Sequence, residues 1–461
     1  MTAQTLPSSF RDPSGYLYRD NGQLYRRITN IGIASYQKLL SSGFYDALVK
    51  NQLLIQHIET SHTDQSIVIK PDEIPYISYP YEWCFSQLKD AALLTLKIQK
   101  MALAHNMSLK DASAFNVQFH HGKPIFIDTL SFEDFTPGPW VAYKQFCQHF
   151  LAPLSLIAYK DRRFNKTTAN HIDGLPLDLT SKLLPWKSYI NLGLLLHIHL
   201  HAKYQDKHSN DSECSTNNKP SISKEKMMAM IGQIESTIKK LEWGGADTEW
   251  RDYYSKTNYQ PAAMKQKREL VEAYLKTIEP SPQKILDLGA NNGEFSHLAA
   301  KSGCYVVSQD IDESAVEANY LHCKNSGINN VLPLIQDLTN PTPAIGWEHN
   351  ERMSLLERCN ADACLALALI HHLAISNNLP LTKIASFFSR ATNYLIIEFV
   401  PKTDSQVRRL LKTREDIFSN YNQEQFEHSF REYFTICSKD TISNSDRIMY
   451  LMKRLAVEKA E

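Results

Sequence analysis

The chain has 461 residues, which is too long for one ordinary hydrophobic core, and usual domain sizes predict roughly two to three domains. Hydrophobic residues make up 43% of the sequence and charged residues 22%, a composition typical of a folded globular protein. Lysine plus arginine and aspartate plus glutamate number 50 each, so no net charge attracts the chain to nucleic acid or anionic lipid.

The first part of the chain predicts an α+β domain over residues 1–203. The stretch GYLYRDNGQLYRRI, which begins at Gly15, predicts a short β-hairpin, and residues 34–59 predict a helix. The stretch IPYISYPYEW is a candidate strand, and a long helix is expected over residues 86–104. A second hairpin, VQFHHGKPIFI, then leads directly to Asp128.

Three polar residues around this second hairpin have a characteristic spacing. Asp111 and Asn116 form a D-x-x-x-x-N pair, and Asp128 follows the hairpin. The arrangement resembles the catalytic half of protein kinases, which implies a general base at Asp111 and magnesium ligands at Asn116 and Asp128. The chain departs from that family because it has no G-x-G-x-x-G loop and continues Asp-Thr-Leu where kinases have Asp-Phe-Gly.

Because the parts that grip phosphate are missing, we expect a degenerate kinase-like domain that binds a substrate or partner. A working phosphotransferase is the alternative. Lys70 has the look of a nucleotide-pairing lysine, but it follows the predicted helix 34–59 instead of preceding it. His197, His199 and His201 alternate without an acidic or cysteine partner nearby, so we predict no metal site.

A change of composition follows at residues 204–226. This stretch is rich in Ser, Asn, Asp and Lys and has almost no large apolar residue, so it cannot bury enough surface to order itself. We predict a polar linker here and a second domain over residues 227–461.

The second domain begins with helical spacing and continues with short apolar runs. Helices are predicted over residues 224–241 and 262–278. Continuous apolar strands that alternate with amphipathic segments indicate a parallel sheet covered on both faces, and the last two strands suit an antiparallel hairpin at its edge. The strand candidates are KILDL (284–288), YVVSQ (305–309), VLPLI (331–335), ACLALA (363–368), YLIIEF (394–399), YFTIC (433–437) and RIMYLM (447–452).

The turn after the first of these strands is rich in glycine and asparagine, in the sequence ILDLGANNGEF. In an open α/β sheet the ligand lies beyond the carboxyl ends of the strands. Gly289 and Gly293 can adopt backbone angles closed to other residues, and asparagine tolerates the left-handed region. A dinucleotide loop would require glycine at Asn291 and Glu294. The loop therefore disfavours NAD and favours a ligand that ends in a single carboxylate.

Asp287, Gly289 and Gly293, followed by Asp310 at the end of the next strand, resemble the first motif and its partner in class I S-adenosylmethionine-dependent methyltransferases. The resemblance implies that the loop holds the methionine end of S-adenosyl-L-methionine and that Asp310 accepts hydrogen bonds from both ribose hydroxyls. It also places Asp337 near the adenine amino group. The residues assigned to the cofactor are Asp287, Gly289, Asn291, Gly293, Asp310, Ile311, Asp337 and Leu338.

The alternative is that these acids cap helices and turns of an unrelated sheet. Three residues near the carboxyl ends of the fourth and fifth strands are catalytic candidates. His371 or His372 can take a proton from an acceptor hydroxyl or amine, and Glu398 is a weaker candidate. The two histidines have an alternative role, in which one packs under the sheet and the other caps the next helix.

We therefore predict an α/β fold with a doubly wound, seven-stranded, mostly parallel sheet and an N-terminal α+β domain. The whole chain resembles a family of bacterial methyltransferases distantly related to a nodulation-associated protein. The expected activity is methyl transfer to a protein or small molecule. RNA is the next acceptor class, with RRLLKTRED (408–416) as its basic element, and a non-catalytic cofactor-binding scaffold is a further alternative.

No targeting segment is recognisable in this sequence. The N-terminus, MTAQTLPSSF, lacks a basic stretch followed by an apolar one, and the most apolar run, YINLGLLLHIHL, is too short to span a bilayer. The eight cysteines stand at irregular spacings with no CxxC pair, which is typical of reduced, buried thiols. These features predict a cytoplasmic protein without a membrane partner.

Overall fold

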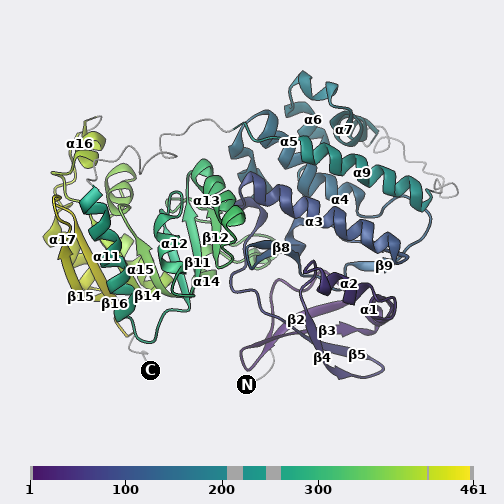
Figure 1. Cartoon of the computed structure of the whole chain (residues 1–461), viewed down its shortest axis with the longest axis horizontal. Coiled ribbons are helices and arrows are strands. Elements are labelled where there is room, and N and C mark those ends of the chain that lie inside the picture. The colour runs from purple at the N-terminus through teal and green to yellow at the C-terminus, as the bar shows by residue number, and fades with distance from the viewer. Residues whose placement is uncertain (1–3, 205–221, 245–260, 413–414, 457–461) are drawn as a thin grey trace. The chain divides into compact units, whose positions relative to one another are not determined.

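The computed structural model describes residues 4–204, 222–244, 261–412 and 415–456 (Figure 1). The described residues form two compact units. The first comprises the described residues up to 244 together with Ile345–Arg352, and the second comprises residues 261–344 and the described residues from Met353 onward. The segment Ile345–Arg352 thus belongs to the first unit although the chain on both sides of it belongs to the second.

The first unit contains an antiparallel sheet in the order β1-β2-β3-β5-β4. Helix α1 (Asn30–Ser41) covers it, and Tyr36 of this helix is buried against Ile28, Ile67 and Ile69 of the sheet. The strands are β1 (Gln4–Thr5), β2 (Gly15–Asp20), β3 (Gln23–Thr29), β4 (His57–His62) and β5 (Ser66–Pro71). The predicted hairpin at Gly15 corresponds to β2 and β3.

The rest of the first unit is largely helical and is built around the long helix α3 (Phe85–Ala104), which the sequence predicts. Two small antiparallel strand pairs, β6 with β9 and β7 with β8, follow it. These elements are α2 (Phe44–Lys50), η1 (Pro80–Glu82), β6 (Met107–Leu109), η2 (Ala114–Asn116), β7 (Val117–His120), β8 (Lys123–Phe126), β9 (Phe132–Asp134), α4 (Tyr143–Phe146), η3 (Cys147–Leu151), α5 (Ala152–Tyr159), η4 (Arg162–Ala169), α6 (Leu177–Leu183), η5 (Trp186–Ile190), α7 (Leu192–Leu194), η6 (Leu195–Leu200) and α9 (Lys224–Lys240).

Two predictions for the first unit are wrong. The helix expected over residues 34–59 is interrupted by Gly43, whose φ of 71° breaks the helical path, and β4 begins at His57. The stretch IPYISYPYEW, expected as a strand, forms no ladder and contains the single helical turn η1. Its aromatic side chains pack into the interior instead, with Trp83 fully buried.

The boundary between the units also differs from the predicted linker at 204–226. Residues 205–221 lie outside the described part of the chain, and α9, whose residues from 227 the sequence assigns to the second domain, belongs to the first unit. Its apolar stripe packs on α3, and Lys89 of α3 donates to the carbonyl oxygens of Lys239 and Leu241 at 2.9 and 2.8 Å. The sequence predicted the helix α9 from its apolar spacing, but it did not predict that this helix packs on α3.

The second unit contains the predicted seven-stranded sheet, in the order β12-β11-β10-β13-β14-β16-β15. The pairs among β12, β11, β10, β13 and β14 are parallel, whereas β16 runs antiparallel to both β14 and β15. The strands are β10 (Lys284–Leu288), β11 (Tyr305–Asp310), β12 (Val331–Ile335), β13 (Ala361–Ala366), β14 (Thr392–Phe399), β15 (Phe434–Thr441) and β16 (Ile448–Arg454).

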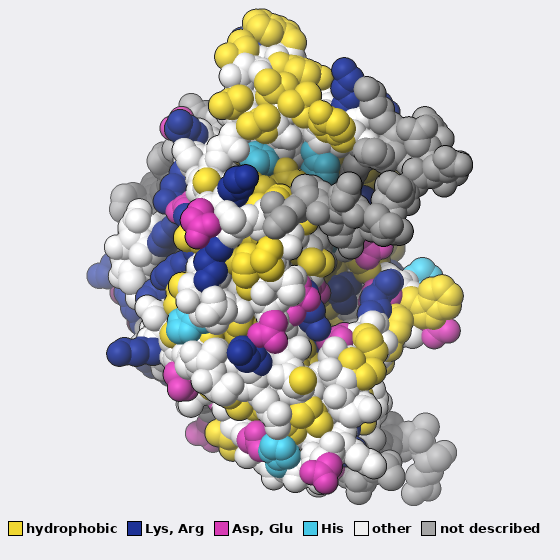
Figure 2. Space-filling view, turned by 90° about the vertical axis from the view of Figure 1, so that its right-hand side faces the viewer, with side chains coloured by type: hydrophobic (Ala, Val, Ile, Leu, Met, Phe, Trp, Pro, Cys, Tyr) yellow, Lys and Arg dark blue, Asp and Glu magenta, His cyan; other side chains and the backbone are white. Residues whose placement is uncertain are grey.

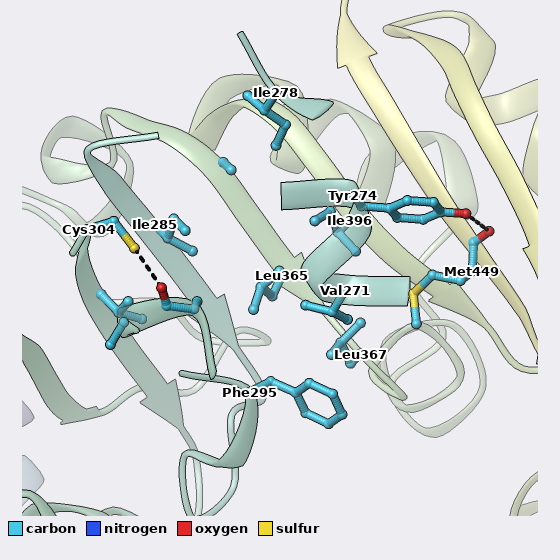
Figure 3. Packing of buried hydrophobic residues seen from close by; sticks show 14 of the residues in the cluster. Val271, Tyr274, Ile278, Ile285, Phe295, Cys304, Leu365, Leu367, Ile396 and Met449 are labelled. Carbon is cyan, nitrogen blue, oxygen red and sulfur yellow. Dashed lines mark hydrogen bonds between the residues drawn. The ribbon is translucent and has the colours of Figure 1, made fainter. Parts of the chain in front are cut away.

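Helix α11 (Pro261–Thr277) is fixed to this sheet by a buried apolar cluster (Figure 3). Val271 and Tyr274 of the helix lie against Leu365, Ile396 and Met449 from three strands, and the Tyr274 hydroxyl donates to the Met449 carbonyl oxygen at 3.2 Å. The other helices are α12 (Glu294–Ala300), α13 (Glu313–Ser326), η7 (Trp347–His349, in the first unit), α14 (Leu355–Arg358), η8 (His372–Ser376), α15 (Leu381–Ala391), α16 (Ser405–Leu411) and α17 (Gln423–Arg431).

The surface of the first unit carries a patch of exposed apolar side chains. Figure 2 shows hydrophobic side chains gathered at the top of one face, at the level of α6 and α7 in Figure 1. The exposed apolar residues of this part of the chain are Trp186, Tyr189, Ile190, Leu192 and Leu196. Among the described residues, no helix is long and apolar enough to cross a membrane.

Candidate functional site

A cavity of about 240 Å³ opens at the carboxyl ends of the parallel strands in the second unit. The strand order reverses at β10, which has β11 on one side and β13 on the other, and ligands of open α/β sheets bind at such a switch point. The lining residues follow the four strands in turn: Gly289 and Asn291 after β10; Asp310 and Ile311 at β11; Gln336, Asp337, Leu338 and Thr339 after β12; and Leu367, Ala368, Leu369, His372, Leu373, Ser376 and Asn377 after β13, with Lys267 of α11.

The loop after β10 has the backbone that its composition predicts. Gly289, Asn291 and Gly293 have φ angles of 78°, 51° and 84°, all in the left-handed region. Gly293 also lacks room for a side chain, because a Cβ atom there would lie 2.4 Å from Nδ2 of Asn319. Glycine is therefore required at Gly293 on two counts, and Asn291 takes a conformation that asparagine tolerates.

Asp310 joins the loop to the end of β11. Its Oδ2 accepts the backbone N–H of Asn291 at 2.8 Å, and its Oδ1 accepts that of Asp312 at 2.8 Å. Burial raises the pKa of Asp310 to about 6, although these two N–H groups oppose the rise. A carboxylate has about four lone-pair positions, so one on each oxygen is left for a ligand hydroxyl.

Asp287 lies beneath the cavity and does not line it. Its Oδ2 accepts the hydroxyl of Ser296 at 2.6 Å, which fixes α12 to the sheet. Burial raises the pKa of Asp287 to about 7, and the nearby charge of Asp310 adds to the rise. Gly293 also lies outside the lining. These two residues of the predicted cofactor set therefore support the loop, Asp287 through its hydrogen bond with Ser296 and Gly293 through its backbone conformation.

The remaining cofactor candidates do line the cavity. Asp337 holds a turn, since its Oδ1 accepts the backbone N–H and the hydroxyl of Thr339 at 2.9 and 2.6 Å. Ile311 is half exposed and Leu338 lies in the loop after β12, which gives the cavity two apolar side chains suited to a flat ring.

The structure separates the three catalytic candidates. His372 lines the cavity, and burial lowers its pKa to about 4, so its ring is neutral near pH 7. His371 is fully buried, and neither ring nitrogen has a hydrogen-bond partner among the described residues. Glu398 is fully buried and lies outside the lining.

Sequence similarity extends over both units. The chain is 33% identical to the nodulation protein NoeA of Rhizobium meliloti (strain 1021) over an alignment of 464 positions, which covers 97% of this chain and 96% of that protein. The chain belongs to the NoeA family. No protein-family model matches the sequence.

Similarity to solved structures covers a smaller part of this NoeA-family chain. Magnesium protoporphyrin IX methyltransferase (ChlM) from Synechocystis PCC 6803, solved with bound SAH, is 17% identical, with 45% of this chain and 93% of that chain covered and a TM-score of 0.32. N-methyltransferase NodS from Bradyrhizobium japonicum WM9 is 10% identical, with 43% of this chain and 99% of that chain covered and a TM-score of 0.32.

A buried charge network in this NoeA-family protein was not predicted. Lys267 of α11 donates to Oε2 of Glu398 at 2.6 Å, and Arg447 lies 3.3 Å from Oε1 of Glu398 and 2.8 Å from Asp404. Burial lowers the pKa of Lys267, and Glu398 opposes that effect. A signal was available, because Lys267 lies four residues from both Ala263 and Val271 on the apolar stripe of its helix.

The first unit of the NoeA-family chain brings the three kinase-like candidates to one cavity of about 550 Å³, whose lining includes Asp111, Asn116 and Asp128. Arg26 of β3 forms an ion pair with Oδ1 of Asp128, and Ser131 donates its hydroxyl to Oδ2. Although burial opposes it, Arg26 holds the pKa of Asp128 below its usual value, whereas burial raises the pKa of Asp111. The kinase-like interpretation stays a prediction.

Outside these cavities, two of the three alternating histidines, His197 and His199, have ordinary hydrogen-bond partners, whereas Nδ1 of His201 is buried and has none among the described residues. His197 pairs with the Tyr143 hydroxyl at 2.7 Å and with Gln233 at 2.6 Å, and His199 lies 2.8 Å from the hydroxyls of both Ser181 and Ser188.

Proposed function

We propose that the second unit binds S-adenosyl-L-methionine in the 240 Å³ cavity and transfers its methyl group to an acceptor. The position of Asp310 carries the proposal. This carboxylate stands at the switch point of the sheet, and each of its oxygens already accepts one backbone N–H and can accept one more hydrogen bond. Two adjacent hydroxyls of a ribose match that geometry.

Lys267 extends the proposal to the other end of the ligand. It is the only lysine or arginine among the residues described as lining the cavity, and it enters from α11 beside the loop at Gly289. An ammonium group there attracts the ligand's carboxylate. Glu398 holds Lys267 in place, and Arg447 balances the charge of Glu398. We therefore assign Glu398 a positioning role in place of the catalytic one.

When bound, S-adenosyl-L-methionine supplies a methyl group already activated by a sulfonium centre. The protein then has to orient the acceptor and exclude water. Leu367, Leu369 and Leu373 supply apolar walls after β13, and His372 among them is positioned to accept a proton from the acceptor. A neutral imidazole is the form that this role requires.

We propose the class of the methyl acceptor from the charge balance of the sequence. The sequence carries equal numbers of basic and acidic residues, so a protein or small-molecule acceptor remains favoured over RNA. The basic element RRLLKTRED (408–416) begins within α16, and its residues 413–414 lie outside the described chain.

Calorimetry with S-adenosylhomocysteine tests the cofactor assignment. We expect saturable binding by the full chain and its loss in Asp310→Ala. Asp362→Ala is a matched control, because Asp362 also accepts two backbone N–H groups, from Gln283 and Lys284 at 2.8 and 3.0 Å, yet lies outside the cavity lining. Equal loss in both variants, or binding of NADH instead, contradicts the proposal.

Transfer is tested separately with a labelled methyl group. Incubation with fractionated extracts is expected to label one protein or small-molecule fraction, and His372→Ala is expected to reduce the label while leaving S-adenosylhomocysteine binding intact. Binding without transfer to any fraction supports the scaffold alternative.

A further inference from the structure

The 550 Å³ cavity of the first unit has unpaired polar atoms in its lining residues. Nε of Arg26, Nδ1 of His57, Oγ1 of Thr129 and Nε of Arg352 are all buried and have no hydrogen-bond partner among the described residues. Leaving one such atom unpaired costs about 1–3 kcal/mol, and folded proteins contain few of them. Four around one cavity indicate that a ligand completes their hydrogen bonds.

The chemistry of these atoms defines the ligand. A guanidinium N–H can only donate, so the two arginines require an acceptor. The hydroxyl of Thr129 can also donate. The other ring nitrogen of His57 is already engaged, since it lies 3.0 Å from the Tyr36 hydroxyl. The missing groups are therefore mainly hydrogen-bond acceptors.

The positive charge of Arg352 also favours a ligand that carries hydrogen-bond acceptors. Its guanidinium lies 4.2 Å from the ring centroid of Phe115, and its Nη1 donates to the carbonyl oxygen of Glu351 at 2.8 Å. The Glu351 carboxylate is occupied by Arg11, at 2.6 Å. Among the described residues no carboxylate lies within ion-pair distance of Arg352, so this half-buried cation has no ion pair of its own.

We propose that this cavity binds a small organic molecule through its phosphate or carboxylate group, with Arg26, Arg352 and Thr129 as donors and without a bridging divalent ion. Asp128 is a poor ligand for such an ion in this arrangement, because its charge is already paired with Arg26 and its oxygens also accept hydrogen bonds from Ser131 and the Leu130 N–H. The site is independent of the methyltransferase assignment.

The other lining residues and the volume of the cavity indicate the size and polarity of the rest of the ligand. Ile55, Ile69 and Ile127 provide apolar walls, and its volume lies within the range of about 300–1,000 Å³ usual for small-molecule pockets. Asp111 faces the same space, and its Oδ1 accepts the Ser113 N–H at 2.9 Å. A hydroxyl or amine on the ligand fits beside it.

Calorimetry on the full chain in the presence of EDTA tests the site with three probes: inorganic phosphate, AMP and citrate. We expect saturable binding of at least one probe, and the probe that binds separates a phosphate ligand from a carboxylate ligand. Thr129→Val keeps the shape of the side chain and removes only an unpaired hydroxyl. It is expected to fold with at least the wild-type melting temperature and to bind about tenfold more weakly, which is the effect of one hydrogen bond.

Arg352→Gln is the second variant, and it is expected to weaken binding about tenfold or more because a charged donor is lost. Asp310→Ala is the control, since it alters the second unit and is expected to bind the anion normally, so failure of the cofactor assignment would not affect the result. The proposal is overturned if no probe binds, if both cavity variants bind like wild type, or if binding and phosphate release from ATP require Mg²⁺.

Discussion

Binding of S-adenosylhomocysteine is expected to weaken as the pH falls through the pKa of Asp310, which is about 6 in the ligand-free protein. The ligand's hydroxyls donate to the ionised carboxylate, so they stabilise that form and lower its pKa in the complex. Affinity is therefore fully present above about pH 7 and is lost as protons compete below pH 6. The direction follows because free protein takes up a proton that the complex excludes.

The size of the effect follows from the same equilibrium. Below the pKa of Asp310, each pH unit reduces the ionised fraction about tenfold, so the Kd should rise about tenfold between pH 6 and pH 5. His372 has a pKa of about 4 and remains neutral over this range. Asp287 has a pKa of about 7 and is already protonated over this range, so Asp287→Asn is expected to leave the slope between pH 6 and pH 5 unchanged.

The assay is calorimetric titration of the full chain at half-unit steps from pH 7.5 to pH 5. Asp310→Asn should bind weakly at every pH and show a flat profile, while Asp362→Asn should follow wild type. A constant wild-type Kd over this range would refute the role given to Asp310, as would a variant that keeps the wild-type slope.

Three substitutions test other parts of the second unit. Glu398→Gln leaves the buried Lys267 without its charge partner, and urea unfolding should show a loss of about 3–5 kcal/mol; an unchanged midpoint contradicts the network. His371→Leu replaces a fully buried ring with no hydrogen-bond partner among the described residues, so the melting temperature should be equal or higher, with methyl transfer retained. Gly293→Ala should lower stability by about 1–3 kcal/mol because of its φ of 84° and the crowding by Asn319, and wild-type stability in thermal unfolding would count against that strain.

The strands of the second unit were predictable because they are buried on both faces. Lys284–Leu288 and Val331–Ile335 are short, mostly apolar runs bounded by turn residues, and their predicted limits coincide with β10 and β12. The strand β4 gave no such signal, since all of HIETSH after the first residue is exposed and carries no alternation. Nothing in the sequence of that segment therefore argued against the predicted helix.

The candidate site was predictable where a backbone requirement dictates the residue type. Gly289, Asn291 and Gly293 reveal the left-handed loop, and an acid that ends the next strand meets it. The different fates of His371 and His372 could not be predicted, because a turn of a helix decides which of two neighbours faces the cavity. The partner of Arg11, Glu351, lies 340 residues away along the chain, a pairing that no local pattern encodes.

The eight-residue excursion Ile345–Arg352 has a consequence for dissecting the protein. It is held by Glu351, which accepts hydrogen bonds from both Arg11 and the Trp347 N–H, so its place is fixed by charge as well as by chain path. A gene fragment that stops near residue 244 would encode a first unit with part of its cavity wall missing and Arg11 unneutralised. The complementary fragment would contain Ile345–Arg352 without the unit on which this segment packs. Separate expression of the first unit is therefore expected to require that this short peptide be added to its sequence.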